Sequence, residues 1–458
     1  MDESNSPRRA EAQDSLAGPG ASVPTAQRGM AAPSRVVRGV AASYVNIGAG
    51  VLCNLALIPL YVKYLGRVEY GLWIAVSGLV AYLGLLNLGI TQTTANLCAE
   101  AVATSSTGRA RQVLATGFWS YVRVAAVALG GLALAGPLVP WHLIFKGAAG
   151  NVGAPTLVVL ACAATFLVEL PFTLFAGCLR NLGRIEQQQV VATLQNVARL
   201  GIAFAFLWAG GRLLGLVLLL SAANLATGWL NYRLLARALP GATLSPQLSD
   251  ATLRREMKGP SAYFLVLQAG GALAFGSDAV IISVVLGANE VAPYSIAQRL
   301  AFMAAGAIAA ISANFAPGFI EANARGDRQA LRKLYRKATA ISAGLGTIVA
   351  AGLLVAGPAF IRLWVGPANF VGTVPFVAII ALLFIQMVLS PADALLVSTG
   401  NHRAYAVAAA WEAVLGIGLA VVLGLHMGVA GVAIAKLGAR IFGAGPVMVL
   451  QSHRLVAR

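Results

Sequence analysis

The chain has 458 residues, of which 58% are hydrophobic and only 11% are charged, and its formal net charge is +17. This small share of charged groups cannot keep a protein of this length soluble in water. The composition therefore excludes a soluble protein and predicts a membrane protein. The excess of Lys and Arg lies between hydrophobic segments, which indicates membrane topology rather than a nucleic-acid-binding surface.

The N-terminal region, residues 1–37, is rich in Ser, Pro, Ala and Arg and lacks the apolar core of a signal peptide. We expect it to form a disordered cytosolic tail. The four cysteines lie in or beside apolar segments without CxxC spacing, which predicts small core residues and neither a disulfide nor a metal site. They are Cys53, Cys98, Cys162 and Cys178.

Apolar stretches of about twenty residues, long enough to span a bilayer as a helix, occur about twelve times. The predicted helices are 40–62, 70–92, 113–137, 156–178, 189–210, 213–233, 260–285, 292–316, 338–360, 374–398, 404–425 and 428–449. Only the sequence GGR separates the fifth helix from the sixth. We expect an all-α polytopic protein with two six-helix bundles, 38–237 and 259–449, a cytoplasmic linker, 238–258, and a cytosolic tail, 450–458.

The distribution of basic residues orients these helices. With the N-terminus inside, about 23 Lys and Arg residues fall on the cytoplasmic side and about 5 on the outer side, as the positive-inside rule requires. Both termini are therefore expected in the cytoplasm. The basic sequence RGDRQALRKLYRK, residues 325–337, predicts an amphipathic segment that is attracted to anionic membrane lipid.

The sequence carries no pattern typical of bond-making chemistry. The predicted outer loops are short, which argues against a membrane glycosyltransferase, polymerase or ligase. HExxH, GxSxG and P-loop motifs are absent, and the histidines are scattered over separate loops and the tail. These are His142, His402, His426 and His453. We therefore expect a protein that is not an enzyme and that needs no cofactor.

The chain contains an internal repeat with an offset of 221 positions. LGRVEYGLW (Leu65 to Trp73) matches LGANEVAPY (Leu286 to Tyr294), EAVA (Glu100 to Ala103) matches EANA (Glu321 to Ala324), and AGP recurs in the same register. Because each half has six helices, the two halves share one orientation, which predicts a parallel repeat with a substrate path between the halves. This is the plan of a transporter that works by alternating access.

Several segments resemble a known family. The sequences YLGRVEYGLWIAVSGLVAYLGLLNLGI, SDAVIISVVLGANEVAPYSIAQRL, LWVGPANF and STGNHRAYAVAAAWEAVLGIGLAVVLGLHMGVAGVAIAKLGARI are similar to those of polysaccharide transporters in the multidrug/oligosaccharidyl-lipid/polysaccharide exporter superfamily. The most similar group is the Wzx-like O-antigen flippases. Where this family often has DLGI, the chain has NLGI, with Asn87 in place of the acid. The resemblance covers nearly all of residues 38–449.

The resemblance implies two bundles that form a V around a central cavity. It also implies a bacterial inner-membrane flippase, which moves undecaprenyl-pyrophosphate-linked oligosaccharide from the cytoplasmic to the outer leaflet for polysaccharide or exopolysaccharide biosynthesis. The implied partners are the lipid-linked glycan, a polysaccharide polymerase and glycosyltransferases. The transporter itself is expected to be a monomer.

Nine charged residues lie within the predicted helices: Arg123, Glu169, Arg199, Asp278, Arg299, Asp393, Glu412, Lys436 and Arg440. A charge at the centre of a membrane costs at least ~2–3 kcal/mol unless it is paired or hydrated, so none should face lipid. Each therefore either pairs within the bundle or lines an aqueous passage that binds substrate.

Asp278 and Arg299 lie about ten residues on either side of one turn, so they reach similar depths and an ion pair between them is geometrically easy. Two explanations account for the burial of these charges: they form a structural ion pair, or they line the path of the substrate. Lys436 and Arg440 share a helix face. Together with Arg199 and Arg123 they are candidates to bind pyrophosphate. The alternative is that they snorkel to the membrane surface or pair internally with Glu412.

Glu169 precedes Pro171, and Asp393 follows Pro391, in corresponding helices of the two halves. An acid beside a proline kink predicts a hinge or an ion-coupling site, and helix packing is the alternative; Glu412 is a further coupling candidate. A cation-coupled multidrug antiporter of the same superfamily is the alternative function, and a non-transporting scaffold or scramblase is a third. Basic residues outnumber acids in the helices by five to four, which favours an anionic substrate.

Overall fold

The computed structural model describes residues 33–87, 89–104, 106–141, 145, 155–255, 257, 276–399 and 403–457. The predicted tail up to residue 32 and most of the predicted helix at 260–285 lie outside these residues. The described part of the chain is helical and contains no strand.

The first half of the chain forms one lobe, which we call the N-lobe. Its elements are α1 (Pro33–Ala81), η1 (Tyr82–Asn87), α2 (Ile90–Ala103), α3 (Thr107–Ala135), η2 (Gly136–Leu138), α5 (Pro155–Glu169), η3 (Leu170–Phe172), α6 (Thr173–Asn181), α7 (Ile185–Trp208) and α8 (Leu213–Ala238). The predicted division between the fifth and sixth helices is confirmed, because α7 ends before α8 begins.

The second half forms the C-lobe, which follows the short helix η4 (Pro246–Leu248). It begins in the described residues with the helix Gly276–Val285. It continues with α10 (Ala288–Ala313), α11 (Ala316–Ala324), α12 (Arg328–Val365), η5 (Pro367–Asn369), α13 (Thr373–Ser398), α14 (Arg403–Phe442) and α15 (Ala444–Ala457).

Eight helical stretches of the described chain are long and apolar enough to cross a membrane, and two of them are double. In α1 the backbone turns at Gly66, with φ 75°, and in α14 it turns at Gly428, with φ 63°. Such positive φ values favour glycine, which has no Cβ. Each long helix therefore comprises two predicted spans. Together with α10 and the helix Gly276–Val285, these stretches account for the predicted twelve helices.

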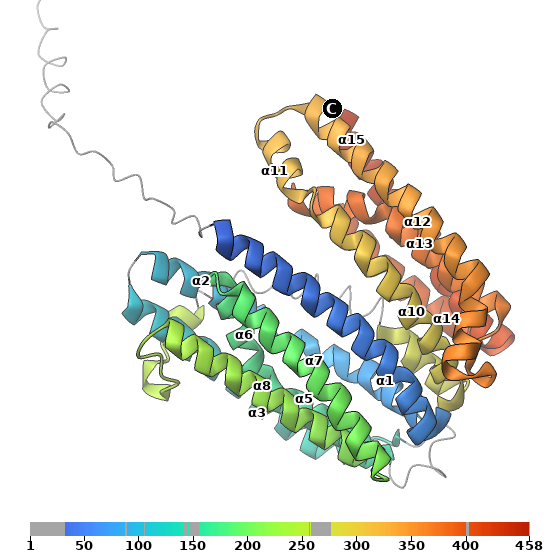
Figure 1. Cartoon of the computed structure of the whole chain (residues 1–458), viewed down its shortest axis with the longest axis horizontal. Coiled ribbons are helices and arrows are strands. Elements are labelled where there is room, and N and C mark those ends of the chain that lie inside the picture. Colours follow the sequence, from blue (N-terminus) through green and yellow to red (C-terminus); the bar gives the residue numbers. More distant parts are fainter. Residues whose placement is uncertain are drawn as a thin grey trace, which may run out of the picture.

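The two lobes form a V. Figure 1 shows them meeting at one end and diverging toward the other, where α1 begins and α15 ends. Gly66 and Gly287, which the 221-residue repeat aligns, both have positive φ, at 75° and 102°. The two lobes therefore make the same turn at equivalent positions, as expected of a duplicated bundle.

The lobes are held together at the closed end by close backbone contact between α1 and the start of the C-lobe. A Cβ added at Gly71 would collide with the Ala288 carbonyl oxygen, and one at Gly78 would lie 2.8 Å from the Gly276 carbonyl oxygen. Trp364 of α12 also donates a hydrogen bond to the Leu55 carbonyl oxygen of α1, at 2.9 Å. Small residues allow membrane helices to approach this closely.

Two spans of the N-lobe are interrupted. The predicted helix at 70–92 is not continuous: the second arm of α1 passes into the 3₁₀ segment η1, and α2 starts only after Gly89, whose φ is 69°. The span 155–181 is likewise broken at η3, which contains Pro171. By contrast, Pro391 lies inside the unbroken helix α13. The predicted kink beside an acid is therefore present at Glu169, whereas α13 remains a single helix at Asp393.

The contact between the lobes yields a testable prediction. We expect Gly71→Ala to lower the melting temperature of the purified protein, because overpacking costs about 1–3 kcal/mol. Gly48→Ala is the matched control, because Gly48 lies in the same helix and a Cβ there meets nothing within 4 Å. Equal melting temperatures for the two variants would contradict the contact.

Candidate functional site

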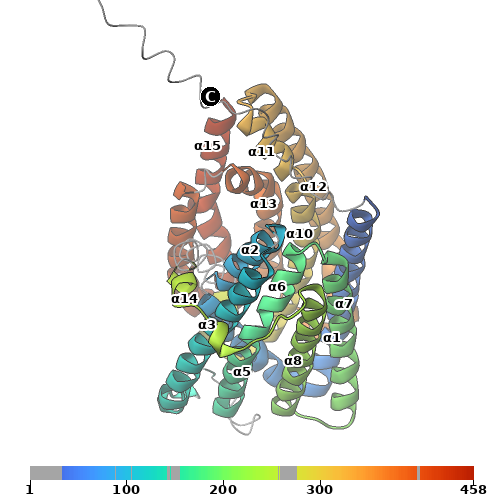
Figure 2. The same ribbon diagram turned by 90° about the vertical axis from the view of Figure 1, so that its left-hand side faces the viewer.

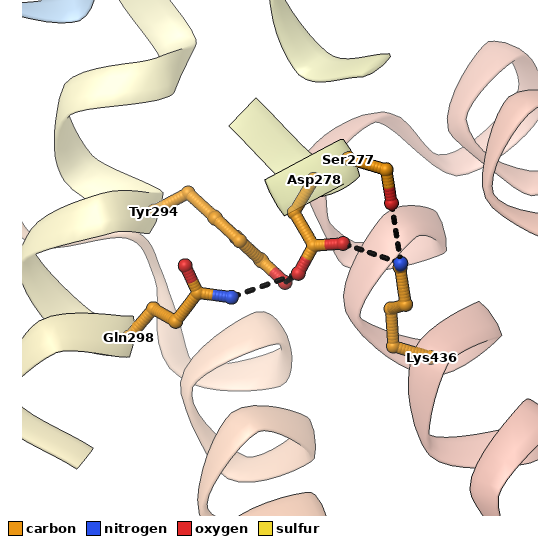
Figure 3. Close-up of polar contacts among 5 residues, drawn as sticks. All are labelled: Ser277, Asp278, Tyr294, Gln298 and Lys436. Carbon is orange, nitrogen blue, oxygen red and sulfur yellow. Dashed lines mark hydrogen bonds and ion pairs between the residues drawn. The ribbon is translucent and has the colours of Figure 1, made fainter. Parts of the chain in front are cut away.

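The charged groups of the C-lobe form internal ion pairs. Lys436 Nζ of α14 lies 2.6 Å from Asp278 Oδ1 and donates a hydrogen bond to Ser277 Oγ at 2.8 Å (Figure 3). Asp278 Oδ2 accepts hydrogen bonds from the Tyr294 hydroxyl at 3.0 Å and from Gln298 Nε2 at 2.8 Å. Asp278 and Lys436 are only 3% and 7% exposed. Desolvation of both charges is thus offset by pairing and by three neutral polar neighbours.

The predicted ion pair between Asp278 and Arg299 is wrong. The carboxylate of Asp278 is instead satisfied by Lys436 of α14 and by Tyr294 and Gln298 of α10. The sequence could not identify this partner, because Lys436 is far away along the chain and its approach depends on how α14 packs.

The second buried pair joins Arg440 and Glu412. Arg440 Nε lies 3.0 Å from Glu412 Oε1, and the other oxygen of Glu412 accepts the Ala444 backbone N–H at 3.0 Å. Of the two predicted alternatives, the internal pair is the one that the structure contains. In this conformation neither Lys436 nor Arg440 offers a free positive charge to a ligand.

Two further candidates lie apart from these pairs. Asp393 interacts with the Tyr405 hydroxyl and lies within electrostatic reach of Arg440, so it extends the polar network of the C-lobe. Arg123 is exposed on α3, where its guanidinium lies 3.5 Å from Ser249 Oγ in the segment that links the lobes. Arg123 therefore belongs to the linker contact in this conformation.

Arg199 and Arg299 differ from the other cations. Arg199 lies on α7 of the N-lobe and Arg299 on α10 of the C-lobe, and both act electrostatically on the Tyr61 hydroxyl of α1. Neither forms an ion pair with a described residue, and the Nε atom of Arg199 is buried without a hydrogen-bond partner in this part of the chain. Two guanidinium groups that form no ion pair with a described residue, one from each lobe, thus lie within electrostatic range of the Tyr61 hydroxyl.

Tyrosine hydroxyls add unused hydrogen-bonding capacity to this region. Tyr61 and Tyr70 are 3% and 1% exposed, and their hydroxyls have no hydrogen-bond partner among the described residues. Arg299 acts on both of them. Buried hydroxyls and guanidinium groups are strongly favoured to find an acceptor, and an anionic oxygen is the acceptor that suits both. We call Tyr61, Tyr70, Arg199 and Arg299 the arginine–tyrosine cluster.

A cavity of about 320 Å³ adjoins this cluster inside the N-lobe. Arg199 lines it, and Trp73, whose ring packs edge-on against Tyr61 with centroids 4.7 Å apart, forms part of its wall. Glu169 also lines the cavity and accepts hydrogen bonds from Ser221 Oγ at 2.5 Å and Asn224 Nδ2 at 3.1 Å. Glu169 is thus held by neutral donors, with the charge of Arg199 nearby.

The two tyrosines were not predicted from the sequence as site residues. The repeat contained a usable signal, because the positions aligned with Tyr61 and Tyr70 in the second half are Ile282 and Val291. The equivalent positions of the second half carry aliphatic residues. The hydroxyl groups of the two tyrosines are therefore not a requirement of the fold that both halves share. Among the described residues, no group of three His, Cys, Asp or Glu side chains could hold a metal ion.

The fold matches solved transporters over almost its whole length. An inward-facing multidrug resistance transporter of the MATE family, in the MOP superfamily, has a TM-score of 0.74 at 15% identity, with 91% of this chain and 98% of that chain covered. The lipid II flippase MurJ, in an inward closed conformation, has a TM-score of 0.68 at 13% identity, covering 93% and 87%. A MOP superfamily transporter from Pyrococcus furiosus has a TM-score of 0.65 at 14% identity, covering 92% and 95%.

These likenesses, with the two lobes, define the fold as that of the MOP superfamily, the multidrug/oligosaccharidyl-lipid/polysaccharide exporters. A sequence profile of the polysaccharide biosynthesis protein family matches residues 36–321, and the chain belongs to this family. No curated protein sequence matches the chain as a relative. The predicted family and fold class are confirmed, and the apolar helices are those of a multi-pass membrane protein.

The pair between Asp278 and Lys436 provides a second prediction. We expect Lys436→Met to reduce the yield of folded protein, because an uncompensated buried carboxylate costs about 3–5 kcal/mol. The double variant Asp278→Asn with Lys436→Met should recover most of that yield, measured by size-exclusion chromatography. Arg332→Met, at an exposed position of α12, is the control. A double variant as poorly folded as Lys436→Met would contradict a structural pair.

Proposed function

We propose that the protein flips an undecaprenyl-pyrophosphate-linked oligosaccharide from the cytoplasmic to the outer leaflet of a bacterial inner membrane. The observation that carries this proposal is the arginine–tyrosine cluster. Its two guanidinium groups belong to different lobes, and neither forms an ion pair with a described residue. Membership of the polysaccharide biosynthesis protein family supports a glycan as the cargo.

The cluster suits a pyrophosphate. Guanidinium groups bind phosphate oxygens through two parallel hydrogen bonds, and the tyrosine hydroxyls donate to the same class of acceptor. Lys436 and Arg440 are neutralised by Asp278 and Glu412, whereas Arg199 and Arg299 form no ion pair with a described residue. An anionic headgroup would offset the desolvation of these two groups.

The arrangement of the lobes is compatible with alternating access. The V opens at the end where α1 begins and α15 ends, which we assign to the cytoplasm from the distribution of basic residues (Figure 1). The headgroup would enter there while the polyprenyl tail stays in lipid. Because Arg199 and Arg299 lie on separate lobes, a bound pyrophosphate would bridge them, and rocking of the lobes would move it to the other side.

A cation-coupled multidrug antiporter is the second candidate. The supporting observation is Glu169, an acid that lines the N-lobe cavity without an ion pair, together with the likeness to a MATE transporter. Such a protein would bind a cation at Glu169, and Arg199 in the same cavity would repel it. The cavity therefore disfavours a cationic cargo at Glu169, and the coupling role of this acid stays a prediction.

We expect Arg199→Gln and Arg299→Gln each to reduce flipping at least tenfold, because each removes one of the two phosphate-binding groups. The substrate is the lipid-linked oligosaccharide extracted from host cells that lack the protein. Flipping is measured in proteoliposomes, as the fraction of labelled oligosaccharide that an external glycosidase can cleave. Arg299→Lys, which keeps the charge but loses the two-pronged geometry, should retain part of the activity.

Arg332→Gln is the matched control, because it removes a charge from the exposed face of α12. Wild-type protein that exports cationic dyes but does not flip the lipid would favour the antiporter. Full flipping by both Arg199→Gln and Arg299→Gln would contradict the assignment of the cluster to pyrophosphate.

A further inference from the structure

The helix α2 carries an exposed stripe of polar side chains. Gln92, Asn96 and Glu100 follow one another at intervals of four residues, so they share one face of the helix, and all three are exposed. The opposite face is buried, with Thr94 and Cys98 both 0% exposed. The fold therefore directs the polar face of α2 outward from the N-lobe.

Hydrogen bonds organise this stripe before any ligand binds. Gln92 Nε2 donates to Asn96 Oδ1 at 2.8 Å, and Asn181 Nδ2, at the end of α6, donates to the same oxygen at 2.8 Å. These two bonds involve neither the amide donors of Asn96 nor the carbonyl oxygens of Gln92 and Asn181. The stripe thus presents donors and acceptors together, in fixed positions.

The position of α2 determines what this face meets. Its main contacts are with α3 and α6 of the N-lobe. Figures 1 and 2 show α2 on the side of the N-lobe that is turned toward the C-lobe, where the two lobes diverge. Because polar side chains are costly against lipid, we expect the polar stripe to face water rather than hydrocarbon.

The stripe is particular to the first half of the chain. The positions that the repeat aligns with Gln92, Asn96 and Glu100 are Ala313, Pro317 and Glu321. The two carboxamides thus have no polar counterpart, although the acid has one. A scaffold requirement of the duplicated bundle would act on both halves, so the carboxamides are better explained by a ligand that meets the N-lobe alone.

The chemistry of the stripe points to a ligand rich in hydroxyl groups. Carboxamides donate and accept at once, as vicinal hydroxyls of a sugar do, and the carboxylate of Glu100 accepts from hydroxyls. The stripe carries no cation, and its one charge is negative, which disfavours phosphate. At ~1.5 Å rise per residue the eight residues from Gln92 to Glu100 extend over about 12 Å, enough for more than one sugar ring.

We infer that Gln92, Asn96, Glu100 and Asn181 form the binding strip for the sugars of the transported lipid, separate from the arginine–tyrosine cluster that holds its pyrophosphate. This inference rests on the proposed flippase function and divides the headgroup between two sites. The sugars would lie against α2 in the opening between the lobes. Loss of the strip would then weaken binding of the glycan without weakening binding of the phosphates.

The experiment measures two ligands separately on the full-length protein in nanodiscs. The first is the free oligosaccharide released by mild acid from the extracted lipid, and the second is undecaprenyl pyrophosphate without sugar. Asn96→Leu and Gln92→Leu should each weaken oligosaccharide binding at least tenfold and leave undecaprenyl pyrophosphate binding unchanged, which also shows that the variants are folded. Arg299→Gln should give the opposite result. Gln329→Leu, at an exposed carboxamide of α12, is the control.

The outcomes separate the two proposals. If wild-type protein flips the lipid but Asn96→Leu and Gln92→Leu bind the oligosaccharide as tightly as the control, the sugar strip is contradicted and the flippase stands. If wild-type protein neither binds nor flips the lipid-linked oligosaccharide, the flippase fails and the strip with it. Equal loss of both ligands in Asn96→Leu would indicate a structural role and would also overturn the strip.

Discussion

The cost of placing charge in a membrane governs the arrangement of this protein. In a medium of low dielectric constant, a charged side chain must be paired, solvated or neutralised. The C-lobe meets this requirement internally, through Asp278 with Lys436 and Glu412 with Arg440. Arg199 and Arg299 have no acidic partner in the described part of the chain, and they approach Tyr61 from opposite lobes. Their desolvation requires either water or an anionic ligand, and this requirement connects the fold to transport.

The functional groups lie where the two halves of a duplicated scaffold differ. Both halves make the same turn at Gly66 and Gly287, and the close contacts at Gly71 and Gly78 hold the lobes together near it. Within this shared frame the repeat aligns Arg299 with Gly78, and Tyr61 with Ile282. The first half supplies tyrosines, a cavity with Glu169 and the polar face of α2. The second supplies a paired-charge network and Arg299, which forms no ion pair with a described residue. In the proposed function each half contributes a different part of the headgroup site.

The sequence predicted the helices well, because the apolar length of a span and the glycines at its turns are local properties. It also identified Asp278, Glu412 and Lys436, which are buried, since a charge within an apolar stretch has few alternatives, but it placed Arg123 with them although Arg123 is exposed. It did not identify their partners: Asp278 pairs with Lys436 rather than Arg299, because pairing depends on the rotation and packing of α14. The interruption of the second span at η1 was missed for a similar reason, since Tyr82–Asn87 reads as continuous apolar helix. Tyr61 and Tyr70 resemble ordinary core aromatic residues in the sequence. Only the alignment with Ile282 and Val291 of the second half shows that they are particular to the first half.

The most direct test of this account measures whether the arginine–tyrosine cluster is reached by an anion from water. In a variant whose four native cysteines, all buried, are replaced by alanine, single cysteines at Arg199, Arg299 and Ile282 are exposed to a negatively charged thiol reagent. The account predicts labelling at Arg199→Cys and Arg299→Cys, and no labelling at Ile282→Cys. Absence of labelling at both arginine positions, with and without substrate, would contradict an aqueous passage through the molecule.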